Sequence, residues 1–338
     1  MPVKILKIVL WCTSTLLLLA VIAGFFFAER WYRAPVPALA EQTVLVPAGS
    51  TYNALVQGLY RREQIDIPIL WRLAGRATGA DARIQAGEYL MPRSVTPEQV
   101  LTRLRRGEGL VSYKVAFIEG WTLREVRGAL ERAPQLTQTM AGMPFSDWAE
   151  ALGIESTSAE GWLFPDTYAY HRGATDKEIL LRAYDRMQRV LADSWASKAE
   201  NLKLATPYEA LTLASIVEKE TGRGSDRGTI SQVFNRRLQL GMKLQTDPTV
   251  IYGIGDDFDG DITRAHLRTD TPYNSYTRFG LPPTPIALPG KESINAALNP
   301  DEGEYLYFVA RGDGTSAFSE TLAEHNAAVR RFQLGQGN

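Results

Sequence analysis

Cysteine is almost absent from this chain of 338 residues, because Cys12 is the only one. A disulfide within the chain is therefore impossible, and a zinc site built from cysteines is excluded. The three histidines lie far apart in the sequence and none stands in an H-E-x-x-H pattern, so we expect no metal. A glycine-rich phosphate loop of the kind that would hold pyridoxal phosphate is also missing, so no cofactor is expected.

The chain also lacks an excess of charge of either sign. It has 37 Lys and Arg residues against 38 Asp and Glu residues, which gives a net charge of -1. Without a basic excess there is no electrostatic footprint for nucleic acid, and no nucleic-acid partner is expected. Hydrophobic residues make up 45% of the chain and charged residues 22%, as in ordinary folded proteins. The length predicts two or three compact units.

One long stretch has no charge at all. Residues 8–28 read "IVLWCTSTLLLLAVIAGFFFA", and as a helix they would be about 31 Å long, close to the hydrocarbon thickness of a bilayer. The following "GFFFAERWY" offers no convincing signal-peptide cleavage site. We therefore predict an uncleaved, single-span membrane anchor over residues 8–28, preceded by a cytoplasmic tail over residues 1–7. Two lysines before the span favour this orientation, and two arginines after it oppose it.

After a linker over residues 29–42, residues 43–93 read as strand, helix, helix and strand. "TVLV" has the character of a short strand, and Ser50 or Thr51 is placed to cap the first helix. The second helix covers residues 68–77, and "IQAGEYLMP" is the closing strand. This βααβ pattern resembles a LysM domain, the small glycan-binding module of cell-wall proteins. Both glycan binding and plain packing without a ligand are open for this unit.

Residues 94–338 are predicted to form a second and larger domain. Helices and strands alternate irregularly there, without βαβ units and without internal repeats. The first helix of this part, "TPEQVLTRLRR", is closed by Gly107. The fold class expected for the chain is therefore α+β, with one transmembrane helix, a small βααβ subdomain and a larger mixed domain.

The best-marked helix of the larger domain is "TPYEALTLASIVEKETG", from its N-cap Thr206 to a C-cap glycine at Gly222. Its apolar stripe contains Ala210, Leu213, Ala214 and Val217. At 100° per residue Glu218 falls at the edge of this stripe, and Glu220 falls on the far side, where we expect it to be solvated. A carboxyl group beside apolar residues has a raised pKa and can act as a general acid. Glu218 is therefore the candidate catalytic residue.

Two further stretches combine rings with short polar side chains. "MKLQTDPTVIYG" places Gln245, Thr246 and Asp247 in a polar step between apolar residues. "TPYNSYTRFGLPPTPIALPG" is a proline-rich loop of the kind that often lines a site. Its side chains suit sugars, which present C–H patches beside hydroxyl groups. They are Tyr273, Asn274, Ser275 and Tyr276.

Nearly the whole sequence resembles the endolytic murein transglycosylases of the MltG (YceG-like) family. The most specific stretches are "EGWLFPDTY", "LASIVEKETG", "VFNRRLQLGMKLQTDPTVIYG", "YNSYTRFGLPPTPIALPG" and "YLYFVARGDGTSAFSETLAEHN". The resemblance implies that Glu218 is the catalytic glutamate and that the glycan cleft includes the segments 245–248 and 273–276. One residue departs from the expected pattern, since Glu320 stands where a neutral polar residue is expected.

The resemblance also implies an activity, a location and partners. The expected enzyme is a lytic transglycosylase that cuts the β-1,4 bond between N-acetylmuramic acid and N-acetylglucosamine within nascent peptidoglycan strands and leaves 1,6-anhydromuramyl ends. One carboxyl group is enough for this reaction, because the attacking hydroxyl belongs to the sugar itself. The catalytic domain is expected in the periplasm, anchored to the bacterial inner membrane beside peptidoglycan synthases. Two alternatives are a membrane-tethered glycan-binding scaffold without activity and a muramidase that admits water.

Overall fold

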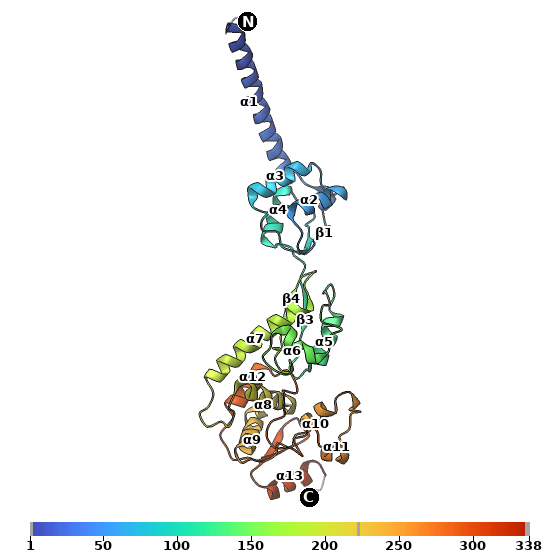
Figure 1. Cartoon of the computed structure of the whole chain (residues 1–338), viewed down its shortest axis with the longest axis vertical. Coiled ribbons are helices and arrows are strands. Elements are labelled where there is room, and N and C mark those ends of the chain that lie inside the picture. The colour runs from blue at the N-terminus through green and yellow to red at the C-terminus, as the bar shows by residue number, and fades with distance from the viewer. Residues whose placement is uncertain (1–2, 222–223, 335–338) are drawn as a thin grey trace. The chain divides into compact units, whose positions relative to one another are not determined.

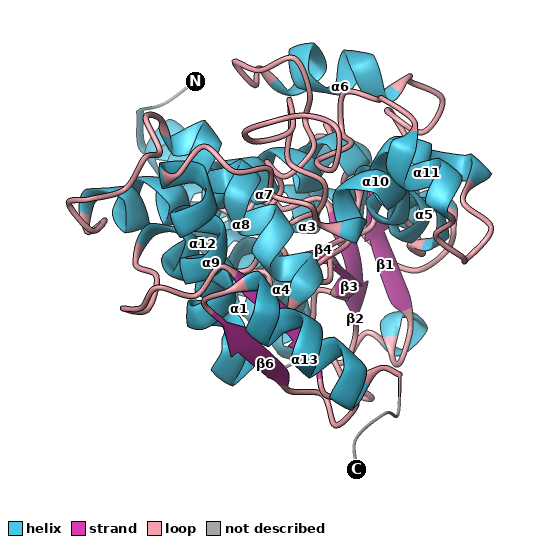
Figure 2. Cartoon of the chain, turned by 90° about the horizontal axis from the view of Figure 1, so that it is seen from below, coloured by secondary structure: helices cyan, strands magenta, loops and turns pink. Residues whose placement is uncertain are grey.

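The computed structural model describes residues 3–221 and 224–334, which form two compact units. The first unit comprises the chain up to Tyr113 and two short later segments, and the second comprises most of the remainder. Both are drawn in Figure 1. Helices dominate and the strands are short, as Figure 2 shows. The strands form three separate two-stranded sheets in the described residues. The predicted α+β class with a single N-terminal apolar helix is confirmed.

The first unit contains the apolar helix and the βααβ elements. Its helices and strands are α1 (Val3–Arg33), η1 (Pro37–Leu39), β1 (Thr43–Val46), α2 (Tyr52–Arg61), α3 (Pro68–Thr78), β2 (Gly87–Leu90) and α4 (Pro97–Arg106). Within the described residues α1 is the one helix long and apolar enough to cross a membrane. Thr51 caps α2 by accepting a hydrogen bond from the backbone N–H of Ala54. The order strand, helix, helix, strand is as predicted.

The core of the first unit lies between the β1–β2 sheet and the helices. β1 and β2 are antiparallel, with Thr43 opposite Leu90. The side chains that fill this core include Val44, Val56 and Trp71, together with Val100 and Leu101 of α4. The sequence predicts α4 as part of the larger domain, but its apolar face completes the core of the smaller unit. The smaller unit therefore extends beyond the βααβ elements.

The second unit is built mainly from helices. In chain order its elements are β3 (Tyr113–Ala116), α5 (Leu123–Arg132), α6 (Phe145–Leu152), β4 (Thr167–Tyr170), α7 (Asp176–Ala196), α8 (Pro207–Glu220), η2 (Gly224–Asp226), α9 (Arg227–Gln239), α10 (Asp247–Ile254), η3 (Gly255–Asp257), α11 (Arg264–Arg268), α12 (Lys291–Leu298), β5 (Tyr307–Ala310), β6 (Ser316–Ser319) and α13 (Leu322–Phe332). The strands β3 and β4 each have residues that belong to the first unit. β5 and β6 form an antiparallel hairpin, and α13 packs on both strands.

Helix α8 lies at the centre of the second unit, packed against α7, α9, α10 and α12. All eight residues from Ala210 to Val217 are buried. The expectation of one apolar stripe and one solvated face is therefore wrong. Thr212 and Ser215 tolerate burial because each hydroxyl donates to a carbonyl of the preceding turn, of Tyr208 and of Thr212 respectively.

The N-terminal end of α8 is the one that the sequence predicts, and the C-terminal end is not. Thr206 is the N-cap, as predicted, and accepts a hydrogen bond from the backbone N–H of Glu209. The carboxylate of Glu209 accepts from the N–H of Ala205, so the reciprocal half of the capping box is displaced by one residue. The helix ends at Glu220 with Thr221 as C-cap. The predicted C-cap Gly222 lies outside the described residues.

Candidate functional site

A cavity of about 620 Å³ opens at the C-terminal end of α8. One wall is formed by Glu220, the loop before α10 and Tyr276. The opposite wall is formed by the β5–β6 hairpin and α13. The residues that line it are Glu220, Arg237, Leu244, Gln245, Asp247, Tyr276, Tyr307, Phe308, Val309, Ala310, Ser316, Leu322, His325, Asn326, Val329 and Gln333. Segments from three parts of the second unit therefore meet here.

Glu220 is the glutamate of α8 that faces this cavity. Its side chain is only partly exposed, and its Oε1 accepts a hydrogen bond from the hydroxyl of Thr246. Burial raises the pKa of the Glu220 carboxyl, and the nearby charge of Asp247 raises it further, while the hydrogen bond from Thr246 acts in the opposite direction. The expectation that Glu220 is an ordinary solvated residue is wrong, because α8 is covered on all sides. A partly buried carboxyl with a raised pKa has the property required of a general acid.

Glu218 lies on the opposite side of α8, 200° around the helix from Glu220. Its side chain is 8% exposed. Its Oε2 accepts a hydrogen bond of 2.9 Å from the backbone N–H of Gly290, and its Oε1 is 3.8 Å from Nη2 of Arg227. At this distance Arg227 is a charged neighbour of Glu218 and not a hydrogen-bond donor to it. The carboxyl of Glu119 is also near, because burial and then the charge of Glu218 raise its pKa. The geometry therefore does not place Glu218 in the cavity described above, and its catalytic role stays a prediction.

Gln245 projects into the cavity from a strained position of the backbone. Its φ is 50°, a left-handed conformation that few residues other than glycine adopt. Its backbone N–H donates to the carbonyl of Ser275 at 3.1 Å. The next residue, Thr246, is buried, and its N–H donates to Oγ of Ser275 at 3.0 Å. The strain therefore turns Gln245 outward while Thr246 points back at Glu220, and such strain is commonly found at functional sites.

Tyr276 and Asp247 form a pair at the rim of the cavity. The hydroxyl of Tyr276 donates to Oδ1 of Asp247 at 2.6 Å. Burial and the charge of Asp247 raise the pKa of Tyr276 above its usual value. Of the seven predicted binding residues, the cavity therefore brings together Gln245, Asp247 and Tyr276.

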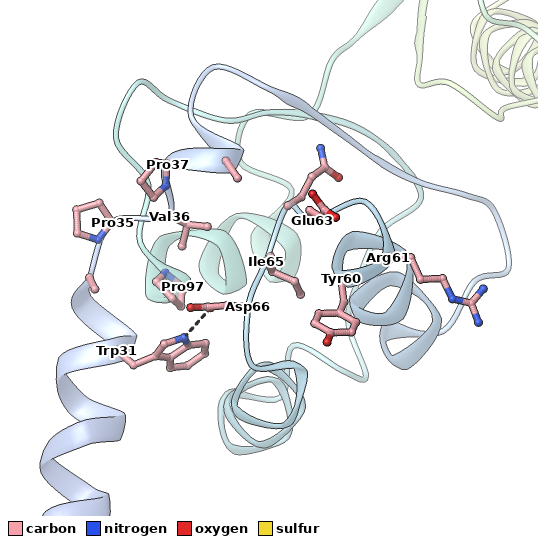
Figure 3. A pocket seen from close by; sticks show the side chains of 13 residues that line it. Trp31, Pro35, Val36, Pro37, Tyr60, Arg61, Glu63, Ile65, Asp66 and Pro97 are labelled. Carbon is pink, nitrogen blue, oxygen red and sulfur yellow. Dashed lines mark hydrogen bonds between the residues drawn. The ribbon is translucent and has the colours of Figure 1, made fainter.

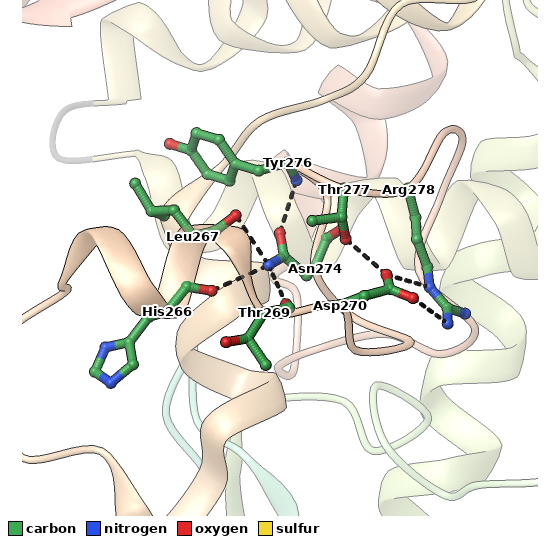
Figure 4. A network of polar contacts seen from close by, with 8 residues as sticks. All are labelled: His266, Leu267, Thr269, Asp270, Asn274, Tyr276, Thr277 and Arg278. Atoms are coloured by element: carbon green, nitrogen blue, oxygen red, sulfur yellow. Dashed lines mark hydrogen bonds and ion pairs between the residues drawn. The ribbon is translucent and has the colours of Figure 1, made fainter.

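Asn274 was expected to hold a substrate group, but it is fully buried. Its Nδ2 donates to the carbonyls of His266, Leu267 and Thr269, and its Oδ1 accepts from the N–H of Tyr276, as Figure 4 shows. Asn274 is not among the residues that line the cavity. Asn274 therefore supports the loop that presents Tyr276, and its direct contact with substrate stays a prediction.

The other predicted binding residues also lie behind the cavity wall. Thr246 and Ser275 are buried and hydrogen-bonded to each other's segments. Tyr273 donates to or accepts from Thr284 at 2.9 Å and packs against Tyr252 at 4.9 Å between ring centroids. It lines a different cavity of about 530 Å³, beside the buried carboxyl of Glu160. Thr246 and Ser275 therefore hold the segments that present Gln245, Asp247 and Tyr276 to the cavity.

The opposite wall contains residues that the sequence did not single out. His325 stacks on Tyr307 with 5.2 Å between ring centroids, and its Nδ1 is buried without a hydrogen-bond partner. Burial and the charge of Arg237 lower the pKa of His325, so its ring is neutral at neutral pH. Arg237 itself donates to the carbonyls of Leu244 and Leu306. The stretch "SETLAEHN" contains His325 and Asn326, both of which line the cavity, whereas Glu320 of the same stretch is exposed and does not line it.

The cavity is suited to a neutral ligand with both polar and apolar groups. Gln245, Asn326 and Gln333 offer amides, and Phe308 and Leu322 offer apolar surface. In the described part of the chain, no group of three His, Cys, Asp or Glu side chains is placed to hold a metal ion. The chemistry available at the site is therefore proton transfer by Glu220 to a ligand held by amides, hydroxyls and rings.

Comparison with known proteins gives consistent matches. A model described as the YceG-like family matches residues 44–331. A protein of Bacillus subtilis named endolytic murein transglycosylase is 30% identical, over 92% of this chain and 91% of that one. A protein of Streptococcus pneumoniae with the same name is 26% identical, over 94% of this chain and 64% of that one. The crystal structure of a YceG-like protein from Listeria monocytogenes aligns with a TM-score of 0.55 at 29% identity, covering 85% of this chain and 98% of that one.

Proposed function

Since the chain belongs to the YceG-like family, we propose that it is a membrane-anchored lytic transglycosylase that cuts within peptidoglycan strands. The bond cleaved is the β-1,4 bond between N-acetylmuramic acid and N-acetylglucosamine, and the product carries a 1,6-anhydromuramyl end. The observation that carries the proposal is the partly buried Glu220 at the wall of a large cavity of mixed polarity.

Glu220 supplies both proton transfers in this proposal. Its protonated carboxyl donates to the glycosidic oxygen, and the N-acetyl group of the muramyl sugar stabilises the cationic centre that forms. The carboxylate then removes the proton from the 6-hydroxyl of the same sugar, which closes the anhydro ring. The attacking group is already part of the substrate, so proximity replaces a second carboxylate. Positioned proton transfer of this kind contributes about 10²- to 10⁴-fold to the rate.

The remaining cavity residues bind and orient the sugar chain. Gln245 is exposed in the cavity and presents an amide that can pair with an acetamido group. Tyr276 presents a ring, with its hydroxyl fixed by Asp247. Asp247 is the one further carboxylate of the cavity besides Glu220 in the described residues. It would have to activate water if the enzyme were instead a muramidase, so the chemical nature of the product distinguishes the two reactions.

The family resemblance assigned the acid to Glu218, and Glu218 remains the alternative to Glu220. Both are tested by mass spectrometry of the fragments released from purified glycan strands by the wild type, Glu220→Gln and Glu218→Gln. We expect anhydro-ended fragments from the wild type and Glu218→Gln, and none from Glu220→Gln with an unchanged melting temperature. The converse result would return the role to Glu218. Reducing ends would indicate a hydrolase, and glycan binding without fragments from any of the three would indicate a scaffold.

The anchor gives the enzyme its location. α1 is long and apolar enough to cross a membrane. In the proposal it holds the chain in the inner membrane, with the second unit in the periplasm, where nascent glycan strands are available. This orientation, the contact of the LysM-like unit with glycan and an association with peptidoglycan synthases stay predictions. Labelling of an introduced exposed cysteine in intact cells with a membrane-impermeant reagent tests the orientation.

A further inference from the structure

Helix α3 of the first unit carries an exposed apolar face. Ile69 and Leu73 are each 57% exposed, and they stand one helical turn apart on the side opposite Trp71, which is 1% exposed. Arg76 is exposed on the same side. A branched apolar pair of this kind is costly to leave in water, because burying each side chain is worth about 1.5–3 kcal/mol. The face is therefore suited to apolar surroundings.

The position of α3 identifies those surroundings. Trp31, at the end of α1, packs edge-on against Trp71 of α3, with 5.4 Å between ring centroids. Trp31 stands three residues after Ala28, the end of the uncharged stretch, so it lies about 4.5 Å beyond the apolar segment along the helix axis. Figure 1 shows α3 at the end of the unit where α1 emerges. α3 is therefore adjacent to the point where the chain leaves the hydrocarbon.

A second feature marks the same end of the unit. A cavity of about 590 Å³ lies between the end of α1 and the loops around α2, lined among others by Trp31, Pro35, Tyr60 and Asp66. Figure 3 shows Trp31 directed toward Asp66, whose Oδ1 accepts from Nε1 at 3.4 Å. Tyr60 is 47% exposed. Tryptophan and tyrosine with one polar end are the side chains that prefer the membrane–water interface.

We infer that α3 lies on the surface of the bilayer that α1 spans, with Ile69 and Leu73 inserted at the boundary of headgroups and acyl chains. An interfacial helix buries its apolar face about 5–10 Å into this boundary. This depth is larger than the distance of about 4.5 Å along α1 between Trp31 and the end of the apolar segment. α3 carries Arg72 and Arg76 and no carboxylate, which suits an anionic lipid surface. This inference rests on the proposed anchoring of α1.

The test uses the full chain in nanodiscs of phosphatidylethanolamine and phosphatidylglycerol. Cys12→Ser removes the only thiol, and single cysteines at chosen positions then carry a nitroxide label. The labelled variants are Leu73→Cys on α3, Leu17→Cys within α1 and Leu90→Cys on β2. Leu90 is the matched control, because it is 55% exposed in the same unit. The measured quantity is the collision rate of each label with oxygen, relative to that with an aqueous nickel complex.

We expect oxygen to be favoured several-fold at positions 17 and 73 and the nickel complex to be favoured at position 90. A lipid-like ratio at position 17 with a water-like ratio at position 73 overturns the inference and leaves the anchor intact. A water-like ratio at position 17 overturns the anchoring and the inference together. A lipid-like ratio at position 90 as well would show that the first unit adsorbs to the lipid non-specifically, and this result would also overturn the inference about α3. Ile69→Cys repeats the measurement independently one turn away.

Discussion

Replacing Thr246 by valine should extend the activity of the enzyme to higher pH. Thr246 is buried, and its hydroxyl donates to Oε1 of Glu220. This hydrogen bond favours the charged form of the carboxyl and so lowers its pKa, against the larger effect of burial, which raises it. Valine has nearly the same shape as threonine but cannot donate. The protonated form of Glu220, which the reaction requires first, should therefore persist to higher pH.

The magnitude follows from the strength of one hydrogen bond to a charged group. Such a bond contributes about 1.5–3 kcal/mol net, and about 1.4 kcal/mol corresponds to one pKa unit. Glu220 is partly exposed, and water can replace part of the lost interaction. We therefore expect the pKa of Glu220 to rise in Thr246→Val, so that kcat/KM on the alkaline limb is about tenfold higher than that of the wild type at the same pH.

The assay is the pH dependence of kcat/KM for fragment release from purified glycan strands. Asp247→Asn is the matched variant of opposite sign, because the charge of Asp247 raises the pKa of Glu220. Its alkaline limb should move to lower pH. An unshifted limb in both variants, with activity retained, would refute the assignment of Glu220 as the acid. A downward shift in Thr246→Val would refute the account of its hydrogen bond.

Two further predictions concern protein stability and the buried residues Asn274 and Glu160. Asn274→Ala should lower the free energy of unfolding by about 1–3 kcal/mol, because it removes the buried amide that pairs with the carbonyls of His266 and Thr269. Thermal denaturation measures this, and an unchanged melting temperature would contradict it. Burial raises the pKa of Glu160 to about 7, so this carboxyl binds its proton more tightly in the folded chain, and its stabilising contribution is lost as pH rises from about 4.5 to about 7. Glu160→Gln should therefore flatten the dependence of stability on pH over this range, measured by denaturant unfolding, and an unaltered pH dependence would be evidence against it.

The elements of the first unit were predictable because their signals are local. The N-cap Thr51, the prolines at the start of α3 and α4 and Gly107 after α4 each act within one helical turn. The packing of α4 onto the β1–β2 sheet was not predictable in the same way. It depends on residues far apart in the sequence, such as Val44 and Leu101, being buried in one core, which no short pattern encodes.

The candidate site was predictable as a set of segments but not residue by residue. A helical pattern assigns Glu218 and Glu220 to opposite sides of α8, and this is correct. Which side carries the cavity depends on the helices that cover α8, and they cover it all round. The buried position of Asn274 was also hidden, because its partners are backbone carbonyls, which every sequence possesses. The catalytic role of Glu218 itself remains a prediction.

The cavity beside Glu220 has a consequence for the timing of synthesis. Its lining extends to Gln333, which is 113 positions after Glu220 (333 − 220). Chains are made at about 5–20 residues per second, so the last lining residue follows Glu220 by roughly 6–23 s. Under the proposed assignment, a nascent chain with its α1 helix in the membrane carries Glu220 long before it has the α13 wall. The growing chain should therefore be unable to cut the cell wall until almost all of it has been exported.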